Sequence, residues 1–585
     1  MRRFRLFRRP LVLLIAVLSQ ALLLGCARGQ QAQGQQIRGP LGTSLDRYLK
    51  ALVGYGYSGA VLVAKNGEIL LNQGYGLADR DRKTPFTPDT LFDIASISKQ
   101  FTAAAILKLE MQGKLKVEDK LARFFPSAPP DKAGITLHQL MTHTSGLPDS
   151  IGDEYDVMTR DDFLKGVFAT PLEHAPGGRF IYSDAGYAVL AAVVESVSGR
   201  PLGDFLHDQI FEPAGMHHSG LKPSAEDRAR LAHGHSLQGD WGTSLDHAYA
   251  PDGPWWNLRG NGGILTTTGD LYLWDKALQG DAVLSAVERQ KFQRPYVRET
   301  GAPEPKYAYG WSVTTGPTGR TRLAHVGGNG AFGSDFRRYP EDGVVIFVDA
   351  NTVTYSAIMI ADQIERRMFG KPVVEPPAVA AAPEKELQRC AGDYKLGADE
   401  HLKVAAEPGR LAVTADGGEG IGHIFGTVGK ERQKRFAQRD QRVREVLAAA
   451  LQGNFGPLGE LLTLNPERGA KRWRDAVKPT EAELGAFKGF EVLGTTSNDG
   501  VVMTYSRLTF EKGARVLNVM WAGRDAESLS VSPGVRPAYY LPEGPARFAT
   551  FDIGTEAAVH LSCPSPSLLR IETANGPVEA QRVTP

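Results

Sequence analysis

The chain is long and nearly neutral in charge. Its 585 residues exceed what one hydrophobic core usually organises, so we expect several domains. A formal net charge of +1 gives no indication of nucleic acid or of an acidic partner. Three cysteines, Cys26, Cys390 and Cys563, are too few for a disulfide-dense mini-protein or a four-cysteine zinc site.

Residues 1–26 have the order of a secretory signal. Five arginines precede the apolar run LVLLIAVLSQALLLG, which is short for a membrane span. The run ends in LLLGC, which resembles the lipobox of bacterial lipoproteins and would make Cys26 the acylated residue. A plain signal peptide and an uncleaved anchor are the alternatives. We therefore expect export to the periplasm or cell envelope, a lipid anchor in a membrane, and a Gln- and Gly-rich tether over 27–40.

Residues 41–370 are predicted to form one mixed α/β unit. Near its start, SGAVLVAKNGEILLNQGYG places Asn66 and Gly67 between two apolar runs, a strong signal for a β-hairpin. Helical periodicity follows at 98–113, 135–142, 185–198 and 268–279. GSDFRRYP and GVVIFVDAN then predict two further strands. Strands at both ends of the segment, with helices between them, indicate one antiparallel sheet flanked by helices.

The region after residue 370 is predicted to be separate. A Pro- and Ala-rich stretch at 371–385 is typical of an interdomain linker. Short strands and turns at 386–425 and 544–585 predict a small β-barrel or sandwich. Between them, residues 426–543 have a different pattern, which predicts an inserted α+β module.

Export would expose Cys390 and Cys563 to an oxidising compartment. The two could then form a disulfide that ties the first strand region of the barrel to its last. Two separate buried thiols are the alternative. The pairs His217–His218 and His233-x-His235 could suggest metal ligands, but the neighbouring carboxylates form no familiar motif, so we expect no metal site.

Ser96 and Lys99 form an S-x-x-K spacing at the predicted start of a helix. A helix places residues i and i+3 on one face, so the two side chains should be neighbours. A serine hydroxyl becomes a nucleophile when a base takes its proton, and a lysine with a lowered pKa can be that base. The spacing alone is weak evidence, because Ser96 or Ser98 could equally cap the helix while Lys99 is solvated.

Four further motifs follow in order and make the pattern specific. They are LHQLMTHTSGLPD, FIYSDAGYAVLAAVVESVSG, GNGGILTTTGDLYLWDKAL and HVGGNGAFG. Together with LFDIASISKQFTAAAILKL, they resemble the serine β-lactamase and penicillin-binding-protein superfamily, most of all the branch of class C β-lactamases, D,D-peptidases and esterases. The resemblance covers about residues 45–370 and implies a serine β-lactamase-like α/β (α+β) fold with a helical subdomain.

The resemblance assigns chemical roles to residues of this chain. It implies that Ser96 is acylated and that Lys99 accepts the proton of its hydroxyl group. Tyr182 would be a second base, which serves the leaving group and the deacylating water. The backbone N–H groups of Ser96 and Gly328 would form the oxyanion hole.

The resemblance also implies substrate contacts. His325 and Gly327 stand where the family has a strand that lines the cleft, and Gly327 would let a substrate backbone approach. His143 is expected to support the cleft wall. Asp184 stands where the family usually has asparagine, and an ionised aspartate only accepts hydrogen bonds. Near Lys99 it would raise the lysine's pKa and oppose its use as a base; capping of the following helix is the alternative role.

These expectations describe an exported serine hydrolase that acts through an acyl-enzyme without a metal or organic cofactor. Its substrates would be small-molecule or peptide amides and esters, such as D-amino-acid peptides from cell-wall stems, β-lactams or small esters. The alternative is a non-catalytic relative that uses the cleft to bind peptidoglycan or another partner.

Overall fold

The computed structural model describes most of the chain beyond residue 33. The described ranges are 34–236, 239–247, 249–299, 304–352, 356–397, 400–426, 430–462, 466–498, 501–522, 525–555, 557–573 and 576–583. Cys26, the predicted signal segment and residues 27–33 of the predicted tether lie outside them. Among the helices in these ranges, none is both long enough and apolar enough to cross a membrane.

Internal contacts divide the chain into two compact units. The first comprises Met1–Asp46 and Gly59–Asn351, and the second comprises Arg47–Ser58 and Thr352–Pro585. The helix α2 (Gly39–Gly54) contributes residues to both units.

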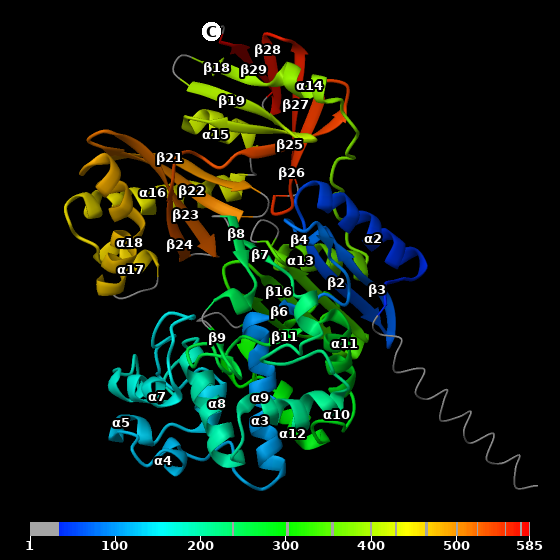
Figure 1. Ribbon diagram of the computed structural model, residues 1–585, viewed down its shortest axis with the longest axis vertical. Helices are drawn as coiled ribbons and strands as arrows, with labels where there is room; N and C mark the ends of the chain where they lie inside the picture. The colour runs from blue at the N-terminus through cyan, green and yellow to red at the C-terminus, as the bar shows by residue number, and fades with distance from the viewer. Residues whose placement is uncertain are drawn as a thin grey trace, which may run out of the picture. The chain divides into compact units, whose positions relative to one another are not determined.

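A nine-stranded sheet forms the centre of the first unit (Figure 1), with the order β1-β3-β2-β17-β16-β15-β14-β13-β12. Its strands are β1 (Gln36–Ile37), β2 (Gly59–Lys65), β3 (Glu68–Tyr75), β12 (Val297–Arg298), β13 (Lys306–Tyr307), β14 (Ser312–Thr315), β15 (Thr321–Gly328), β16 (Gly333–Tyr339) and β17 (Val344–Ala350). Every neighbouring pair is antiparallel. Because β2 pairs with β17, the prediction of one sheet built from both ends of the segment is confirmed.

The sheet begins earlier than the sequence suggests. Gln36 and Ile37 pair with Asn72 and Leu71 of β3, inside the segment 27–40 that is predicted to be a tether. The prediction is wrong for these two residues, because their backbone groups extend the edge of the sheet.

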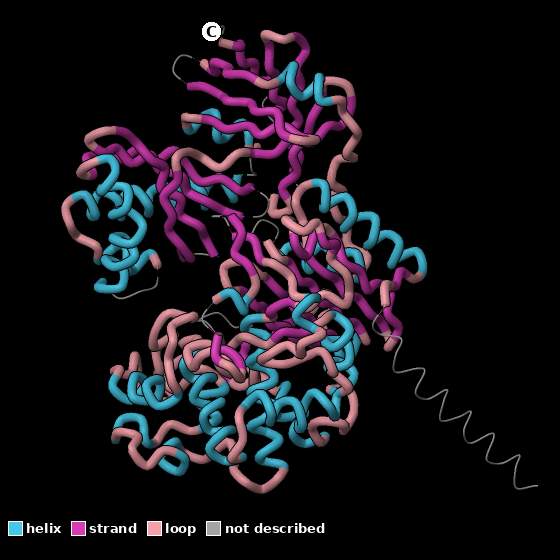
Figure 2. The backbone as a smooth tube through the Cα atoms, in the orientation of Figure 1, coloured by secondary structure: helices cyan, strands magenta, loops and turns pink. Residues whose placement is uncertain are grey.

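Helices and short strands complete the first unit. The helices are α3 (Lys99–Met111), α4 (Leu121–Phe124), α5 (Pro130–Ala133), α6 (Leu137–Met141), α7 (Arg160–Ala169), α8 (Asp184–Ser198), α9 (Leu202–Leu206), α10 (Glu212–Ala214), α11 (Thr268–Ala277) and α12 (Ala286–Gln293). The short strands are β4 (Leu77–Asp79), β5 (Thr84–Pro85), β6 (Phe92–Asp93), β7 (Gly234–Ser236), β8 (Gly239–Gly242), β9 (Tyr249–Ala250), β10 (Gly253–Pro254) and β11 (Leu265–Thr266). In Figure 2, many of these helices gather beside the sheet, so the predicted helical subdomain is confirmed.

The helix α3 is the buried centre of this subdomain. Residues 99–107 are all buried, as expected for a helix that is enclosed on every side. The small residues Ala103, Ala104 and Ala105 let neighbouring elements approach closely, and α8 is in contact with α3. The start of α3 is therefore fixed by packing, which positions the Ser96 and Lys99 pair.

The second unit contains a closed eight-stranded barrel, so the predicted C-terminal barrel is confirmed. Its strands, in barrel order, are β18 (Gly392–Leu396), β19 (Glu400–Glu407), β20 (Arg410–Ala415), β25 (Ala538–Gly544), β26 (Arg547–Asp552), β27 (Ala557–Ser565), β28 (Leu568–Thr573) and β29 (Gly576–Arg582). The barrel resumes at Ala538, whereas the sequence predicts 544. Two helices precede it, α13 (Ala357–Met368) and α14 (Glu384–Cys390).

An α+β module interrupts the barrel between β20 and β25. Its helices are α15 (Gly418–Ile424), α16 (Lys430–Leu451), α17 (Gly456–Leu461) and α18 (Pro466–Leu484). Its four-stranded sheet consists of β21 (Phe487–Asn498), β22 (Val501–Phe510), β23 (Gly513–Ala522) and β24 (Asp525–Ser532). Cys390 and Cys563 form a disulfide with a Cα–Cα distance of 5.8 Å, which joins α14 to β27.

Candidate active site

Ser96 lies in a tight turn that leads into α3. The turn is the 3₁₀ helix η2 (Ala95–Ser98), in which Ser96 is partly exposed. Ala95 has a φ of +42°, a conformation that strains a residue with a side chain. The hydroxyl of Ser98 accepts a hydrogen bond from Ile264 N at 3.2 Å and does not cap α3. The helix-capping alternative for these serines is therefore wrong.

Lys99 is fully buried among polar groups. Its Nζ lies 3.0 Å from Ser96 Oγ and 2.9 Å from Asn261 O, and it forms an ion pair of 2.6 Å with Asp184 Oδ1. Lys99 is thus not a solvated surface residue, and the predicted contact between Ser96 and Lys99 is confirmed.

The charge state of Lys99 follows from its surroundings. Burial alone lowers the lysine's pKa, but the Asp184 carboxylate and the Tyr182 hydroxyl outweigh it, so the pKa is raised. In this direction, Asp184 favours the charged form of Lys99. The cap of α8 is instead Ser183, whose Oγ accepts from Gly186 N at 3.0 Å, so Asp184 is available for Lys99.

Tyr182 is brought into the same group. Burial raises the pKa of its hydroxyl, whereas the charge of Lys99 and hydrogen bonds with Lys99 and Ser96 lower it, and the net direction is upward. The phenol is therefore protonated at neutral pH. The Lys99 ammonium lies 4.8 Å from the centre of the Tyr182 ring, which helps to hold the cation in place.

His143 packs against Tyr182. The two rings stack with centroids 4.4 Å apart and an interplanar angle of 29°. His143 Nδ1 accepts from Ser183 N at 3.0 Å, and burial lowers the pKa of the imidazole well below its usual range. The ring is therefore a neutral, hydrogen-bonded support.

His325 is buried beside the site. Its residue is only 6% exposed, and its Nε2 lies 2.9 Å from Tyr307 Oη. Its Nδ1 lies 2.7 Å from Val326 O, so Nδ1 donates and Nε2 accepts. Burial and the charge of Lys99 lower the pKa of His325 to about 3. Both ring nitrogens are thus paired within the protein, and a contact of His325 with substrate stays a prediction.

Gly327 is required for packing of the site. A Cβ atom at Gly327 would lie 2.2 Å from Ile94 O, closer than real atoms approach. The missing side chain therefore makes room for the segment in front of Ser96; the approach of a substrate backbone at Gly327 stays a prediction. Gly328, the last residue of β15, is exposed next to this contact.

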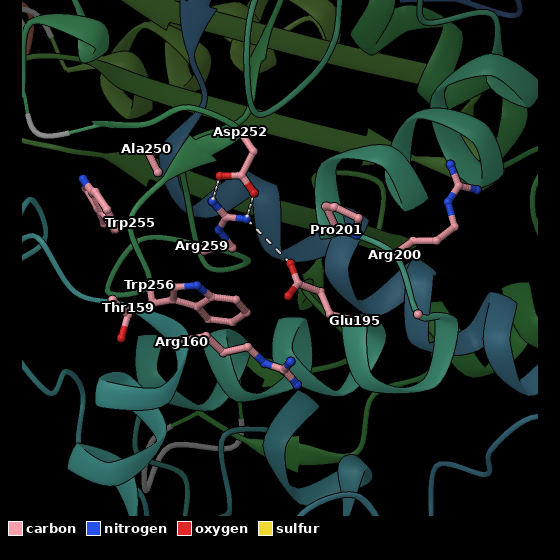
Figure 3. Close-up of a pocket in the computed structure, with 11 residues that line it drawn as sticks. Thr159, Arg160, Glu195, Arg200, Pro201, Ala250, Asp252, Trp255, Trp256 and Arg259 are labelled. Carbon is pink, nitrogen blue, oxygen red and sulfur yellow. Dashed lines mark hydrogen bonds and ion pairs between the residues drawn. The ribbon is translucent and has the colours of Figure 1, made fainter.

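A separate cavity of about 510 Å³ lies in the first unit (Figure 3). Charged side chains dominate its wall, and Arg259 donates two hydrogen bonds of 2.7 Å to the Asp252 carboxylate. Glu195, near the C-terminal end of α8, lies 3.6 Å from Arg259. Arg259 thus pairs with both carboxylates. These ion pairs stabilise the segment before Asn261, whose carbonyl binds Lys99. Elsewhere in the described ranges, no group of three or more His, Cys, Asp or Glu side chains is suited to hold a metal.

Two functional contacts were missed from the sequence. Asn261 binds Lys99 through its backbone carbonyl, and Asp93 accepts from Ala95 N at 2.8 Å in front of Ser96. A carbonyl contact leaves no side-chain signal, although the glycine-rich GNGG motif marks the segment. Asp93 lies inside the LFDIASISK motif and could have been singled out by its position just before the turn.

Comparisons with known proteins identify the family of this chain. The family model described as "Beta-lactamase" matches residues 45–366. Penicillin-binding protein 4* of Bacillus subtilis is 29% identical over 383 residues, which cover 61% of this chain and 83% of that protein. Putative penicillin-binding protein PbpX of the same organism is 34% identical over 272 residues, which cover 46% and 65%.

A solved structure agrees in fold. The octameric penicillin-binding protein homologue from Pyrococcus abyssi has a TM-score of 0.51 and 18% identity, and the match covers 92% of this chain and 99% of that one. The family match spans more than half of the chain and includes every motif around Ser96. The chain therefore belongs to the beta-lactamase family of serine hydrolases.

Proposed function

We propose that Ser96 attacks an amide or ester carbonyl and forms an acyl-enzyme that water then hydrolyses. The observation that carries this proposal is the 3.0 Å contact between Ser96 Oγ and the buried Lys99 ammonium. This contact links the partly exposed Ser96 hydroxyl to Lys99, which in turn contacts other groups that can exchange protons.

Because Lys99 is already protonated, it acts as a relay. As the bond from Ser96 Oγ to the carbonyl carbon forms, the hydroxyl proton passes to Lys99 Nζ, and a lysine proton passes to Asp184 Oδ1. Tyr182 then protonates the leaving nitrogen or oxygen as its bond to carbon breaks. Proton transfer from Lys99 to Tyr182, and from Asp184 to Lys99, restores the starting state. In deacylation, water replaces Ser96 as the attacking group and passes its proton through Lys99 to Asp184, and Tyr182 protonates Ser96 Oγ as its bond to the acyl carbon breaks.

The oxyanion of the tetrahedral intermediate would lie against the N–H groups of Ser96 and Gly328. Contact of β15 with the Ser96 turn at Gly327 and Ile94 supports this assignment, because it brings the two N–H-bearing segments together. Each such donor contributes about 3–4 kcal/mol to lowering a barrier.

Asp184 favours substrates with a free amine on the acyl side. Its side chain is 34% exposed, and its carboxylate accepts hydrogen bonds but cannot donate to a substrate carbonyl. Lys99 is fully buried and His325 is neutral, so neither supplies an accessible cation for a substrate carboxylate. Among D-amino-acid peptides, β-lactams and small esters, we therefore favour aminoacyl amides, peptides and esters, with the D configuration implied by the family.

The substrate proposal is tested with matched substrate pairs. D-Alanine p-nitroanilide and its N-acetyl derivative differ only in the amine, and we expect the free amine to be hydrolysed faster. The Asp184→Asn variant should reverse or abolish this preference, because asparagine offers a donor. An unchanged ratio in the variant would refute the role of Asp184.

The nucleophile is tested by mass spectrometry after incubation with a fluorophosphonate, a labelled penicillin and an ester panel. We expect a covalent adduct on Ser96. If Ser96 remains unlabelled while the chain binds peptidoglycan, the non-catalytic alternative is favoured.

Export and lipid anchoring through Cys26 are also part of the proposal, supported by the basic and apolar order of residues 1–26. Expression in a Gram-negative host with labelled palmitate should give a labelled membrane protein. Cys26→Ser should lose the label, and a labelled variant would contradict the assignment.

A further inference from the structure

We propose that Asp93 is a positioning residue that holds the two halves of the oxyanion hole together. Its carboxylate is 2% exposed and binds both the turn in front of Ser96 and the turn directly after Gly328. This inference rests on the proposed function, in which the N–H groups of Ser96 and Gly328 receive the developing negative charge.

The first contact fixes the turn in front of the nucleophile. Asp93 Oδ1 accepts from Ala95 N at 2.8 Å. Ala95 is held at a φ of +42°, which a residue with a side chain adopts only when its surroundings impose it. The conformation of Ala95 sets the plane of the next peptide group, and that group carries the Ser96 N–H. Asp93 therefore acts on the direction of the first oxyanion donor.

The second contact fixes the turn that follows the other donor. Asp93 Oδ2 accepts from Asn329 Nδ2 at 3.3 Å. The Asn329 side-chain oxygen in turn accepts from Phe332 N at 2.9 Å and Ala331 N at 3.3 Å, so Asn329 shapes the connection from β15 to β16. Gly328 is the residue before Asn329, so the position of its N–H depends on the turn that the Asp93 carboxylate holds.

A third donor completes the coordination of Asp93. Ser244, in the 3₁₀ helix η5 (Ser244–Asp246), donates its hydroxyl to Asp93 Oδ2 at 2.8 Å and is itself buried. The backbone of Asp93 is also held, because β6 pairs with β11 through Asp93 and Leu265. A carboxylate is costly to bury, and two of the donors that offset this cost, Ala95 N and Asn329 Nδ2, come from residues next to Ser96 and Gly328.

Packing explains why such a link is needed. The Ser96 turn and β15 touch where Gly327, which has no side chain, lies against Ile94. The carboxylate of Asp93 adds a directional bond on each side of this contact. Catalysis by an oxyanion hole is sensitive to shifts of well under 1 Å, so this restraint acts on the rate more than on substrate binding.

The test compares Asp93→Asn with wild type. Asparagine keeps an acceptor for Ala95 N–H but places its own NH₂ group opposite the donors of Asn329 and Ser244. We expect kcat to fall about 10- to 100-fold while KM changes less than about threefold. Affinity for phenylboronic acid, whose tetrahedral adduct occupies the oxyanion hole, should fall by a similar factor. Asn329→Ala should give a smaller loss of the same kind.

Asp349→Asn is the matched control. Asp349 is also fully buried in the first unit, and it accepts from Ser334 Oγ at 3.0 Å. We expect this variant to lower Tm without the loss of kcat and boronate affinity. If Asp93→Asn lowers only Tm and keeps both readouts within twofold of wild type, the positioning role is refuted. If wild type itself is not labelled at Ser96 by a fluorophosphonate, it is the proposed function that fails.

Discussion

The polar groups around Ser96 and the barrel of the second unit are stabilised in different ways. Around Ser96, buried charges meet from distant segments: Lys99 contacts Asn261 and Asp184, and Asp93 contacts Asn329. The second unit instead has strands with alternating buried residues, such as β18, β19 and β27, and a disulfide that joins α14 to β27. The comparison teaches that the reaction site depends on a few directional contacts, whereas the barrel depends on a repeated local pattern.

The largest effect should come from removing the nucleophile. Ser96→Ala is expected to lower kcat by about 10⁴-fold or more, because the variant lacks the oxygen that forms the acyl-enzyme. Turnover of the best substrate in the ester and amide panel measures it. Ser98→Ala is the matched control in the same turn and should keep fluorophosphonate labelling, although it loses the bond to Ile264. Undiminished turnover in Ser96→Ala would overturn the assignment.

The next largest effect on kcat is expected from Tyr182, with the nearby Tyr187 as its comparison. Tyr182→Phe removes the hydroxyl that protonates the leaving group, and we expect kcat to fall about 10²- to 10³-fold. Tyr187→Phe is its control, because Tyr187 also packs against His143 but donates its hydroxyl to Met141 O at 2.9 Å. Its kcat should change less than about threefold. Equal losses in both variants would indicate a packing role for Tyr182.

Removal of the disulfide in the second unit should lower stability and leave turnover unchanged, the opposite of what we expect for the changes around Ser96. Replacing both Cys390 and Cys563 by alanine is expected to lower the free energy of unfolding of the second unit by about 2–4 kcal/mol. kcat at 25 °C should stay unchanged. Denaturant unfolding followed by circular dichroism, together with turnover, measures both quantities. A large loss of kcat in the folded variant would mean that turnover depends on the barrel.

The smallest effect concerns pH. Burial and the charges of Asp93 and Asp184 raise the pKa of Glu154 to about 8, against the opposing charge of Lys99. A raised carboxyl pKa means that the folded state binds the proton more tightly. Glu154 therefore makes its full contribution to the free energy of unfolding below the ordinary pKa of 4.5. This contribution is lost as pH rises toward about 8, with a slope of up to about 1.4 kcal/mol per pH unit.

Glu154→Gln should remove this part of the pH dependence. Thermal unfolding between pH 4.5 and 8 gives the comparison, and Asp153→Asn, one residue away, is the control. An unchanged slope in Glu154→Gln would contradict the environment assigned to this carboxyl.

Local patterns in the sequence predicted much of the architecture. Asn66 and Gly67 adopt positive φ values of 51° and 77°, as the hairpin signal requires. The spacing of Ser96 and Lys99 predicted their contact, because neighbouring positions on a helical turn share a face.

Contacts between residues far apart in the chain could not be predicted from such local patterns. Ser183 and Asp184 are both good helix caps, and only the distant Lys99 decides that Asp184 has the other role. The direction in which His325 points and the partner of Gly327 depend on how β15 meets the rest of the unit. Such contacts join residues far apart in the chain and leave no local pattern.

The strand order has a consequence for synthesis of the protein. The edge of β2 (Gly59–Lys65) that finally pairs with β17 (Val344–Ala350) stays open until nearly 300 further residues have been translated. An unpaired, mostly apolar strand edge readily recruits other chains. Nascent polypeptides should therefore need a holding chaperone during this interval, and premature termination before β17 should yield insoluble fragments.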